Sequence, residues 1–397
     1  MNRREFMKTV GCVGVVGLCR SAFADDRVYP GWKEGEFDIH FIHTGTGEQT
    51  FMLFPDGTSM ILDCGHVERT GRKSDYALRI PARPSAECRG GEWTSRYIQR
   101  LVKRREIDWA LVSHWHDDHV MGFPDLVKDF RLLRWSDHQF PSIALHCGDG
   151  DRDCIAFAKE FIPSARAKGM AAEPFVVGAR DQFHMVNGGA GKYDFEIRNL
   201  AADAVVWDGR KDVLNLLAGH VAYTGRDRIA ENQLSNAIRI RYGRFSYYTG
   251  GDVEQQLFRE DGTVVDLEAT VGRVCGPVNV AKMNHHAYWN AMTPGFVKAV
   301  RARAWLSSTW SPNQINGINL PAICTEAFYR GPRTLYHGAM PKGKAEEPAV
   351  RPYLDTFASA QGHVVVKVAP GGGSYRIFVL DAADESMRVL AEDSYSC

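Results

Sequence analysis

Apolar residues in this chain recur in short runs with the spacing of strands, separated by longer stretches with helical spacing. Strands are expected at 109–112 and 195–200. Two further runs, 237–241 and 245–249, alternate as paired strands about Gly243. Because strands and helical stretches follow one another along the chain, the pattern predicts an α/β protein.

The helical stretches have an apolar and a polar face. A helix is expected just before the strand that starts at 109, where Tyr97, Ile98 and Leu101 are the apolar partners of a basic segment, 96–105. Such charges are more typical of the solvated face of a packing helix than of a nucleic-acid groove. A second helix is expected after Thr293, which offers a cap and is followed by proline at the first helical position.

Hydrophobic residues make up 44% of the chain, so it can bury a large core in one or two domains. One domain is expected over residues 25–397. Residues 123–194 are expected to form a long insertion of mixed helix and Gly-rich turns. The segment 82–92, rich in Pro, Arg and Gly, predicts a surface loop. A hairpin at about 362–381 turns at Pro370–Gly373 and is expected at an edge of the fold or as an appendage.

Residues 1–24 have the layout of a cleavable export signal of the twin-arginine type. Arg3 and Arg4 precede an apolar run, Thr9–Leu18, and the small-x-small exit ends at Ala24. The apolar run is too short to remain as a membrane anchor. We therefore expect a periplasmic or secreted protein after cleavage, without a stable membrane anchor.

The charge of the mature chain argues against a polyanionic partner. The full chain carries 48 basic and 48 acidic residues, and the signal removes four basic residues and one acidic residue, which leaves a net charge of −3. A slightly acidic protein is not attracted as a whole to nucleic acid or to an anionic membrane. Nucleic acid thus stays possible as a partner but is not favoured. Pairing of the cysteines, with Cys147 and Cys154 the nearest pair, and the oligomeric state stay open.

Three imidazoles and a carboxylate directly follow a predicted strand, within Ser113–Gly122. In an extended chain, residues two apart point the same way, so His114 and His116 can bind one ion. Asp118 and His119 lie where the chain turns toward a helix and can reach a second ion. Imidazole and carboxylate ligands suit zinc, and also iron or manganese, whereas calcium prefers oxygen ligands alone. The segment predicts a transition-metal centre with one or two ions, most readily zinc.

This His-x-His-x-Asp-His pattern resembles the second signature of the metallo-β-lactamase superfamily, whose members share an αββα sandwich. Several further segments resemble its ComEC-like branch, which is related to the hydrolase domain of a DNA-uptake protein. The resemblance covers roughly residues 37–310. The matching segments, in chain order, are Phe37–Glu48, the hairpin around Pro55–Gly57, Ile61–Gly65, His114–His119, Tyr242–Asp252 and Lys282–Ala287.

The resemblance implies a role for each matching residue. His114 and His116 would hold the first metal, and Asp118, His119 and His286 the second, with Asp252 as the bridge between them. Asp63 would support the site from behind the ligands. Asp118 would also orient the attacking hydroxide, and His285 would meet the substrate or a supporting acceptor, because neighbours on an extended chain face opposite ways.

Two departures from the family pattern bear on the site. The strand at 195–200 continues with Ala201 and Ala202, where the family often has the third ligand of the first metal. Either the site is completed by Asp252 and water, or the centre holds a single metal, or another residue supplies the third ligand. The residues that could supply it are His220, which we favour, Asp203, His184 and His146. The second departure is Ala287, where glycine is usual.

The implied chemistry is hydrolysis, because a divalent metal lowers the pKa of a bound water to about 7. The ComEC-like segments favour a phosphoester substrate, either a phosphodiester or a small-molecule or cell-envelope phosphoester. Hydrolysis of a lactone or a β-lactam amide is the alternative within enzymes. A non-catalytic exported metal-binding protein is the alternative outside them.

Overall fold

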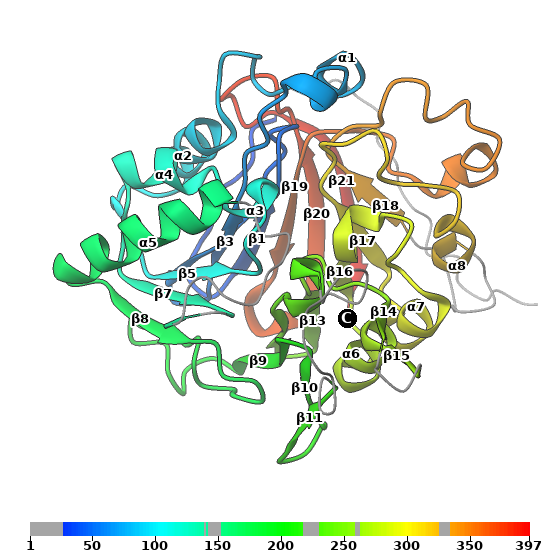
Figure 1. The fold of residues 1–397 in the computed structure, drawn as a ribbon. Coiled ribbons are helices and arrows are strands. Elements are labelled where there is room, and N and C mark those ends of the chain that lie inside the picture. The colour runs from blue at the N-terminus through cyan, green and yellow to red at the C-terminus, as the bar shows by residue number, and fades with distance from the viewer. Residues whose placement is uncertain (1–26, 139, 142–151, 217–229, 259–262, 325–333) are drawn as a thin grey trace, which may run out of the picture.

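The computed structural model describes residues 27–138, 140–141, 152–216, 230–258, 263–324 and 334–397. Two β-sheets pack face to face, and helices cover the outer face of each (Figure 1). This is the αββα sandwich that the sequence predicted. The expected export signal lies outside the described residues.

The first sheet has nine strands in the order β21-β20-β19-β1-β2-β3-β5-β7-β8. Strands β3, β5, β7 and β8 run parallel to one another, and the other pairs are antiparallel. Its strands are β1 (Phe37–Phe41), β2 (Gln49–Leu53), β3 (Ser59–Cys64), β5 (Trp109–Val112), β7 (Arg134–Asp137), β8 (Ala171–Pro174), β19 (His363–Val368), β20 (Ser374–Leu380) and β21 (Val389–Ser396).

The second sheet has eight strands in the order β11-β10-β9-β12-β13-β16-β17-β18. Strands β13, β16, β17 and β18 are parallel, so their carboxyl ends meet at one edge. Its strands are β9 (Phe195–Ala202), β10 (Val205–Trp207), β11 (Val213–Asn215), β12 (Ala237–Tyr242), β13 (Phe245–Thr249), β16 (Val280–Lys282), β17 (Ala304–Ser307) and β18 (Thr334–His337). Two short pairs, β4 (Glu106–Ile107) with β6 (Arg131–Leu132) and β14 (Gln256–Phe258) with β15 (Val264–Asp266), lie outside both sheets.

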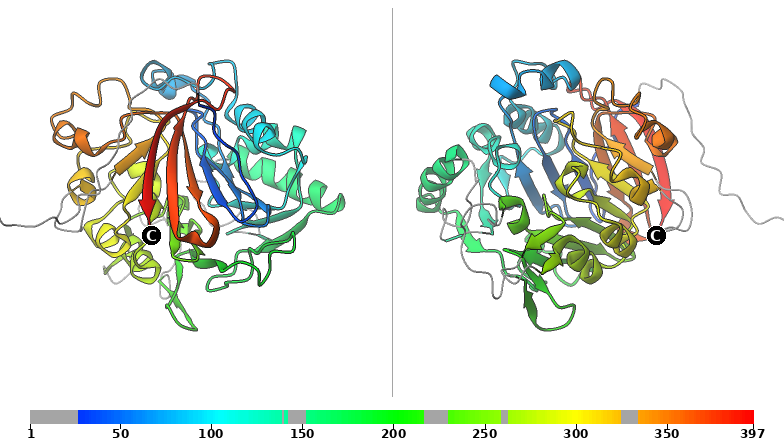
Figure 2. Two further views of the ribbon diagram at one scale, coloured as in Figure 1. Left: turned by 180° about the vertical axis from the view of Figure 1, so that it is seen from behind. Right: turned by 45° about the vertical axis from the view of Figure 1, so that its right-hand side comes forward.

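The apolar core has three parts because each sheet buries both of its faces. The part between the sheets joins residues such as Met52 and Ile238. The other two parts lie between each sheet and the helices that cover it (Figure 2). Ile98 belongs to the part under the first sheet's helices and Phe296 to the part under those of the second. The helices are α1 (Tyr76–Arg79), α2 (Gly90–Leu101), α3 (Asp117–Val120), α4 (Phe123–Asp129), α5 (Arg152–Ala167), α6 (Leu267–Cys275), α7 (Pro294–Val300) and α8 (Leu320–Cys324).

Most of the predicted elements are confirmed, with shifted ends. The predicted strands at 109–112 and 245–249 match β5 and β13, and β9 and β12 extend one or two residues further than expected. Thr293 caps α7 by accepting a hydrogen bond from the Phe296 amide at 3.3 Å. Helix α2 begins at Gly90, inside the segment that was predicted to be a loop.

Two regions that were expected outside the core belong to it. The segment 123–194 contributes β7 and β8 to the first sheet. The hairpin near the C-terminus, β19 and β20, is neither an edge nor an appendage, because β19 pairs with β1 and the unpredicted β21 covers the other side (Figure 2). Among the residues that the structure describes, no helix combines the length and apolar character that crossing a bilayer requires.

The loop that follows β5 is tied to the second half of the fold through a buried carboxylate. Glu231 Oε1 accepts hydrogen bonds from the Trp115 amide at 2.8 Å and from His138 Nε2 at 2.7 Å. The other ring nitrogen of His138 donates to Asp203 Oδ1 at 2.8 Å. Burial alone would lower the pKa of His138, but Glu231 and Asp203 together raise this pKa to about 10.

Replacing His138 by glutamine is therefore expected to change how stability depends on pH. The folded protein keeps a proton that an unfolded histidine loses near pH 6.5, so the contribution of His138 is complete below pH 6.5 and is lost toward pH 10. We expect the wild type to be more stable than His138→Gln by a few kcal/mol near pH 6, with the difference shrinking as the pH rises. Urea unfolding of both proteins in the presence of a chelator, from about pH 6 to pH 10, measures this difference in the free energy of unfolding. A difference independent of pH would contradict this assignment.

Candidate metal centre

The first two histidines of the motif are held side by side at the carboxyl end of β5. His114 is fully buried, and its Nε2 lies 3.1 Å from Nδ1 of His116. This confirms that residues two apart on the extended segment face the same way. Helix α3 starts directly after His116 and packs against Gly65, where an added Cβ would lie 1.6 Å from the Asp118 carbonyl oxygen. Only glycine allows this close approach.

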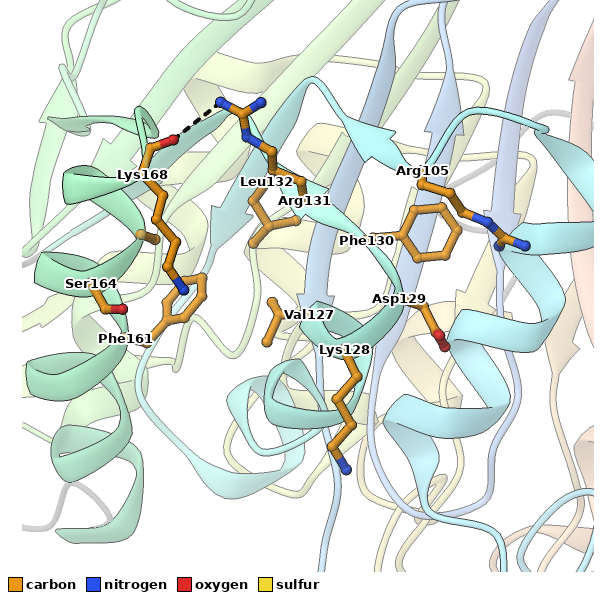
Figure 3. A pocket seen from close by; sticks show the side chains of 11 residues that line it. Arg105, Val127, Lys128, Asp129, Phe130, Arg131, Leu132, Phe161, Ser164 and Lys168 are labelled. Atoms are coloured by element: carbon orange, nitrogen blue, oxygen red, sulfur yellow. Dashed lines mark hydrogen bonds between the residues drawn. The ribbon is translucent and has the colours of Figure 1, made fainter.

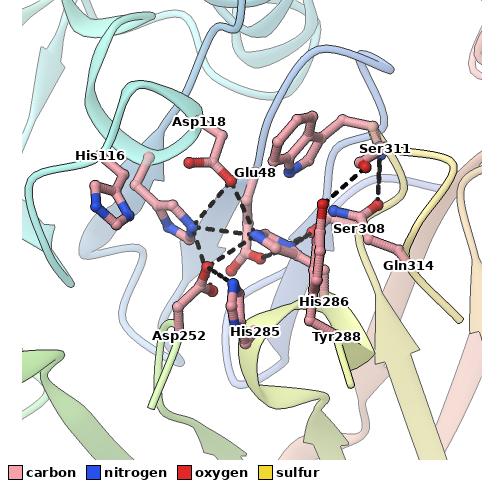
Figure 4. Close-up of polar contacts among 12 residues, drawn as sticks. Glu48, His116, Asp118, Asp252, His285, His286, Tyr288, Ser308, Ser311 and Gln314 are labelled. Carbon is pink, nitrogen blue, oxygen red and sulfur yellow. Dashed lines mark hydrogen bonds and ion pairs between the residues drawn. The ribbon is translucent and has the colours of Figure 1, made fainter. Parts of the chain in front are cut away.

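Asp118, His119 and His286 converge from α3 and from the loop after β16. Nε2 of His286 lies 3.0 Å from Asp118 Oδ2 and 3.2 Å from His119 Nε2 (Figure 4). Asp118 Oδ2 and His119 Nε2 are 3.6 Å apart. Ligands about 2.0–2.1 Å from a tetrahedral zinc ion are separated by roughly 3.3 Å. The three side chains therefore fit a divalent ion as they stand.

Asp252 lies between the two groups of histidines, in the turn after β13. Its Oδ1 is 3.3 Å from His119 Nε2. Its Oδ2 is 3.2 Å from His286 Nε2, 3.8 Å from His285 Nε2 and 3.9 Å from His114 Nε2. One carboxylate thus faces both halves of the centre, which is the placement that a bridging ligand needs.

His285 and His286 adopt left-handed backbone conformations, with φ of 45° and 49°. The expectation that adjacent histidines face opposite ways is wrong here, because it assumed an extended chain. Both rings are turned toward Asp252, and His286 is the nearer of the two. Ala287 also has a positive φ, 60°, which explains why glycine suits this position and shows that the extra methyl group costs backbone strain.

A hydrogen-bond acceptor behind each of three imidazoles fixes which ring nitrogen faces the centre. Nδ1 of His119 donates to Asp63 Oδ2 at 2.8 Å, which is the supporting place that the sequence indicated for Asp63. Nδ1 of His286 donates to Ser308 Oγ at 2.5 Å, and Nδ1 of His285 to Asn290 Oδ1 at 2.8 Å. In each case Nε2 is left with its lone pair directed inward, as a metal ligand requires.

The buried carboxylates of the centre stay ionised. Burial would raise the pKa of Asp252, but His286, His119 and Lys282 hold this pKa well below its usual range. Burial likewise opposes ionisation of Asp118, whose pKa is nevertheless lowered by His119 and His286. For the buried imidazole of His285, burial lowers the pKa to about 4, which keeps it neutral near pH 7. Despite burial, Asp252 and Asp118 raise the pKa of His119 and raise that of His286 to about 10, so a divalent metal bound here would take the place of protons on these two imidazoles.

The third ligand of the first metal is not supplied by the candidates that the structure describes. Ala201 and Ala202 are buried where the family often has a ligand. Asp203 is bound to His138 instead, and His184 is exposed, with its Nδ1 3.0 Å from the Asp181 carbonyl oxygen. His146 and the favoured His220 lie outside the described residues, as does Cys147.

Two charged residues of the centre, Glu48 and Lys282, were not assigned from the sequence. Ligand atoms of Glu48, His119, Asp252 and His286 all lie within 4.8 Å of one another, and all four residues are buried. Lys282 is also buried, with its ammonium 3.2 Å from Asp252 Oδ1. Both residues stand inside the matching segments, but nothing in the local spacing shows that they meet.

A hollow of about 450 Å³ between α4, β6 and α5 lies away from this centre (Figure 3). It is lined by basic and aromatic side chains, including Arg105, Lys128 and Phe161, and contains no histidine. It adjoins the start of β7, whereas the motif follows the carboxyl end of the parallel strand β5. The hollow is therefore not part of the metal centre.

Comparison with solved structures reports low similarity. CmlA from Streptomyces venezuelae, a diiron β-hydroxylase, is 12% identical with a TM-score of 0.41, covering 86% of this chain, and this chain spans 55% of its length. Zn²⁺-bound PqqB from Methylobacterium extorquens is 10% identical with a TM-score of 0.37, covering 83% of this chain and 99% of its own. A long form of RNase Z from yeast is 10% identical with a TM-score of 0.37; the match covers 78% of this chain and 42% of the RNase Z chain.

No curated protein matches the sequence. The family model of the metallo-beta-lactamase superfamily matches residues 44–140, which include the loop after β5 with its three histidines. The same residues supply Asp63, His114, His116, Asp118 and His119 to the geometry described above. The match shows similarity to the metallo-β-lactamase superfamily over residues 44–140, and the αββα sandwich of the chain agrees with it.

Proposed function

We propose that this chain is an exported, metal-dependent phosphoester hydrolase of the ComEC-like branch. The observation that carries the proposal is the convergence of Asp118, His119 and His286 at distances of 3.0–3.6 Å, with Asp252 facing both them and His114. A buried set of ionised carboxylates and inward-facing imidazoles is costly to keep without a bound cation. Zinc suits these donors best.

The residues divide into holders of metal and holders of substrate. His114 and His116 would hold one ion, Asp118, His119 and His286 the other, and Asp252 both. An ion at such a site lowers the pKa of water to about 7 and thereby supplies a nucleophile near neutral pH. Asp118 would also orient that water. His285, whose side chain is 15% exposed and stacks on Tyr288 with ring centres 4.7 Å apart, would contact the substrate.

A cationic side chain close to the centre suits a phosphoester. The ammonium of Lys73 lies 3.0 Å from Asp117 and 5.7 Å from the ring centre of Trp310, whose ring lies 6.0 Å, centre to centre, from that of His286. The Lys73 side chain is 38% exposed, so it can turn toward an anionic substrate group. The ComEC-like segments favour the same class. Hydrolysis of a lactone or a β-lactam amide remains the alternative reaction, and metal binding without turnover the alternative function.

The twin-arginine layout of residues 1–24 supports export, after which the mature chain would act in the periplasm or outside the cell. The net charge of −3 for the mature chain favours a small-molecule or cell-envelope phosphoester over a nucleic acid.

A substrate panel on the mature protein separates these functions. We expect the zinc-loaded wild type to hydrolyse bis(p-nitrophenyl) phosphate and to leave nitrocefin intact. The variants His116→Ala and Asp252→Ala each remove a metal ligand, so kcat/KM should fall at least about 100-fold in both. Hydrolysis of nitrocefin but not of the phosphodiester would contradict the proposed phosphoester hydrolysis and favour β-lactam hydrolysis. No turnover of any panel substrate by the metal-loaded protein would favour a binding protein.

The two sites are expected to differ in affinity, because the second has three protein ligands besides Asp252 and the first has two among the described residues. Metal analysis after dialysis should find about one ion per chain, and titration should add a second, weaker one. His286→Ala should lose the tight ion and His116→Ala the weak one. His184→Ala, at an exposed histidine outside the centre, is the matched control and should bind as the wild type does. Equal affinities would show that an undescribed residue completes the first site.

A further inference from the structure

A buried ion pair lies directly beneath the metal ligands. Lys282 ends β16, and its ammonium is 3.1 Å from Glu48 Oε2 and 3.2 Å from Asp252 Oδ1. The same ammonium donates to the Gly251 carbonyl oxygen. All three donor positions of the amine are therefore used, and the side chain is fully buried.

Glu48 connects this lysine to a second ligand. Its Oε2 accepts a hydrogen bond from Ser308 Oγ at 2.8 Å and lies 3.1 Å from His286 Nδ1. Burial would raise the pKa of Glu48, but Lys282 and His286 hold this pKa at about 2. A closed ring of contacts thus runs from His286 through Glu48 and Lys282 to Asp252, whose Oδ2 is 3.2 Å from His286 Nε2. Figure 4 shows Glu48, Asp252 and His286 of this ring.

The ring determines how Asp252 points. Lys282 and the Gly251 carbonyl that it binds hold Oδ1 on the inner side of the site. The second oxygen, Oδ2, is consequently left toward His114, His285 and His286. His119 Nε2, at 3.3 Å, also faces Oδ1, but Lys282 holds this oxygen from outside the proposed ligand set and does not depend on bound metal.

The two metal sites depend on Asp252 to different extents. The second site keeps Asp118, His119 and His286 if Asp252 turns away. Among the described residues, the first site then keeps His114 and His116, because Ala201 and Ala202 stand where a third ligand is often found.

We propose that Lys282, anchored by Glu48, is a positioning residue that fixes Asp252 as the shared ligand, and that occupancy of the first metal site requires it. The inference rests on the proposed function, since it assumes that the centre binds divalent metal. It adds that a preset carboxylate compensates for the imidazole that is missing directly after β9.

A purely structural role is the competing explanation, and the chain offers a matched control. Lys367, in β19, is also buried, with its ammonium 3.2 Å from Asp38 and in contact with Glu36. Breaking either pair leaves buried carboxylates without their cation and should destabilise the fold to a similar extent. Only the pair at Lys282 touches a proposed ligand.

The test is metal binding by the mature protein with Lys282→Met and Lys367→Met. Zinc and cobalt content per chain, and the visible absorption of bound cobalt, are measured against free metal concentration. We expect wild type and Lys367→Met to bind about two ions, and Lys282→Met to keep the tight ion while its weaker site loses about 10- to 100-fold in affinity. The cobalt spectrum of the tight site should be retained.

Several outcomes would overturn the inference. Wild-type binding of both ions by Lys282→Met would do so, as would an equal loss in Lys367→Met, which would indicate general destabilisation. A wild type that binds no ion would instead refute the proposed function. If Lys282→Met does not fold, Glu48→Gln and the double variant Glu48→Gln/Lys282→Met, which removes both charges together, carry the same expectation for the weaker site.

Discussion

The centre depends on the electrostatics of one buried carboxylate, Asp252, which is only 2% exposed. A charge of this kind costs several kcal/mol in a protein interior unless opposite charge and hydrogen bonds surround it. Here the compensation comes from α3, from the loop after β16 and from Lys282, so elements of both sheets must meet at the same edge. The sandwich provides that edge, because β5 in one sheet and β13 and β16 in the other all end there.

Backbone strain accompanies this convergence. Asp63, His285, His286 and Ala287 all have positive φ, a conformation that costs roughly 1–2 kcal/mol for a residue with a side chain. The loop that carries the two histidines is held by Glu268, which accepts hydrogen bonds from the Asn284 amide group at 2.9 Å and from the backbone of the loop's far end at 2.7 Å. Strain at a functional site persists when the surroundings determine the conformation in this way.

The sequence predicted what short-range spacing controls. The fold class, the central strands and the convergence of His114, His116, Asp118 and His119 follow from local periodicity and from one motif. Three features did not follow. The left-handed turn at His285 has no characteristic residue spacing. Strand β21 is an edge strand that carries polar residues, so it lacks the apolar pattern of a buried strand. The pairing of Glu48 with Lys282 is a contact between segments that are distant in the sequence. Such contacts are set by packing of the two sheets, which a single sequence does not reveal.

The absence of an imidazole after β9 has a physical consequence for catalysis. A site closed by four protein ligands is typical of structural metal, whereas a catalytic site keeps a position open for water or substrate. The second site here already has Asp118, His119, His286 and a share of Asp252. The first site, with His114, His116 and the other face of Asp252, is the one with room for an incoming oxygen. The less completely ligated half of the centre is therefore where the proposed function would place its substrate.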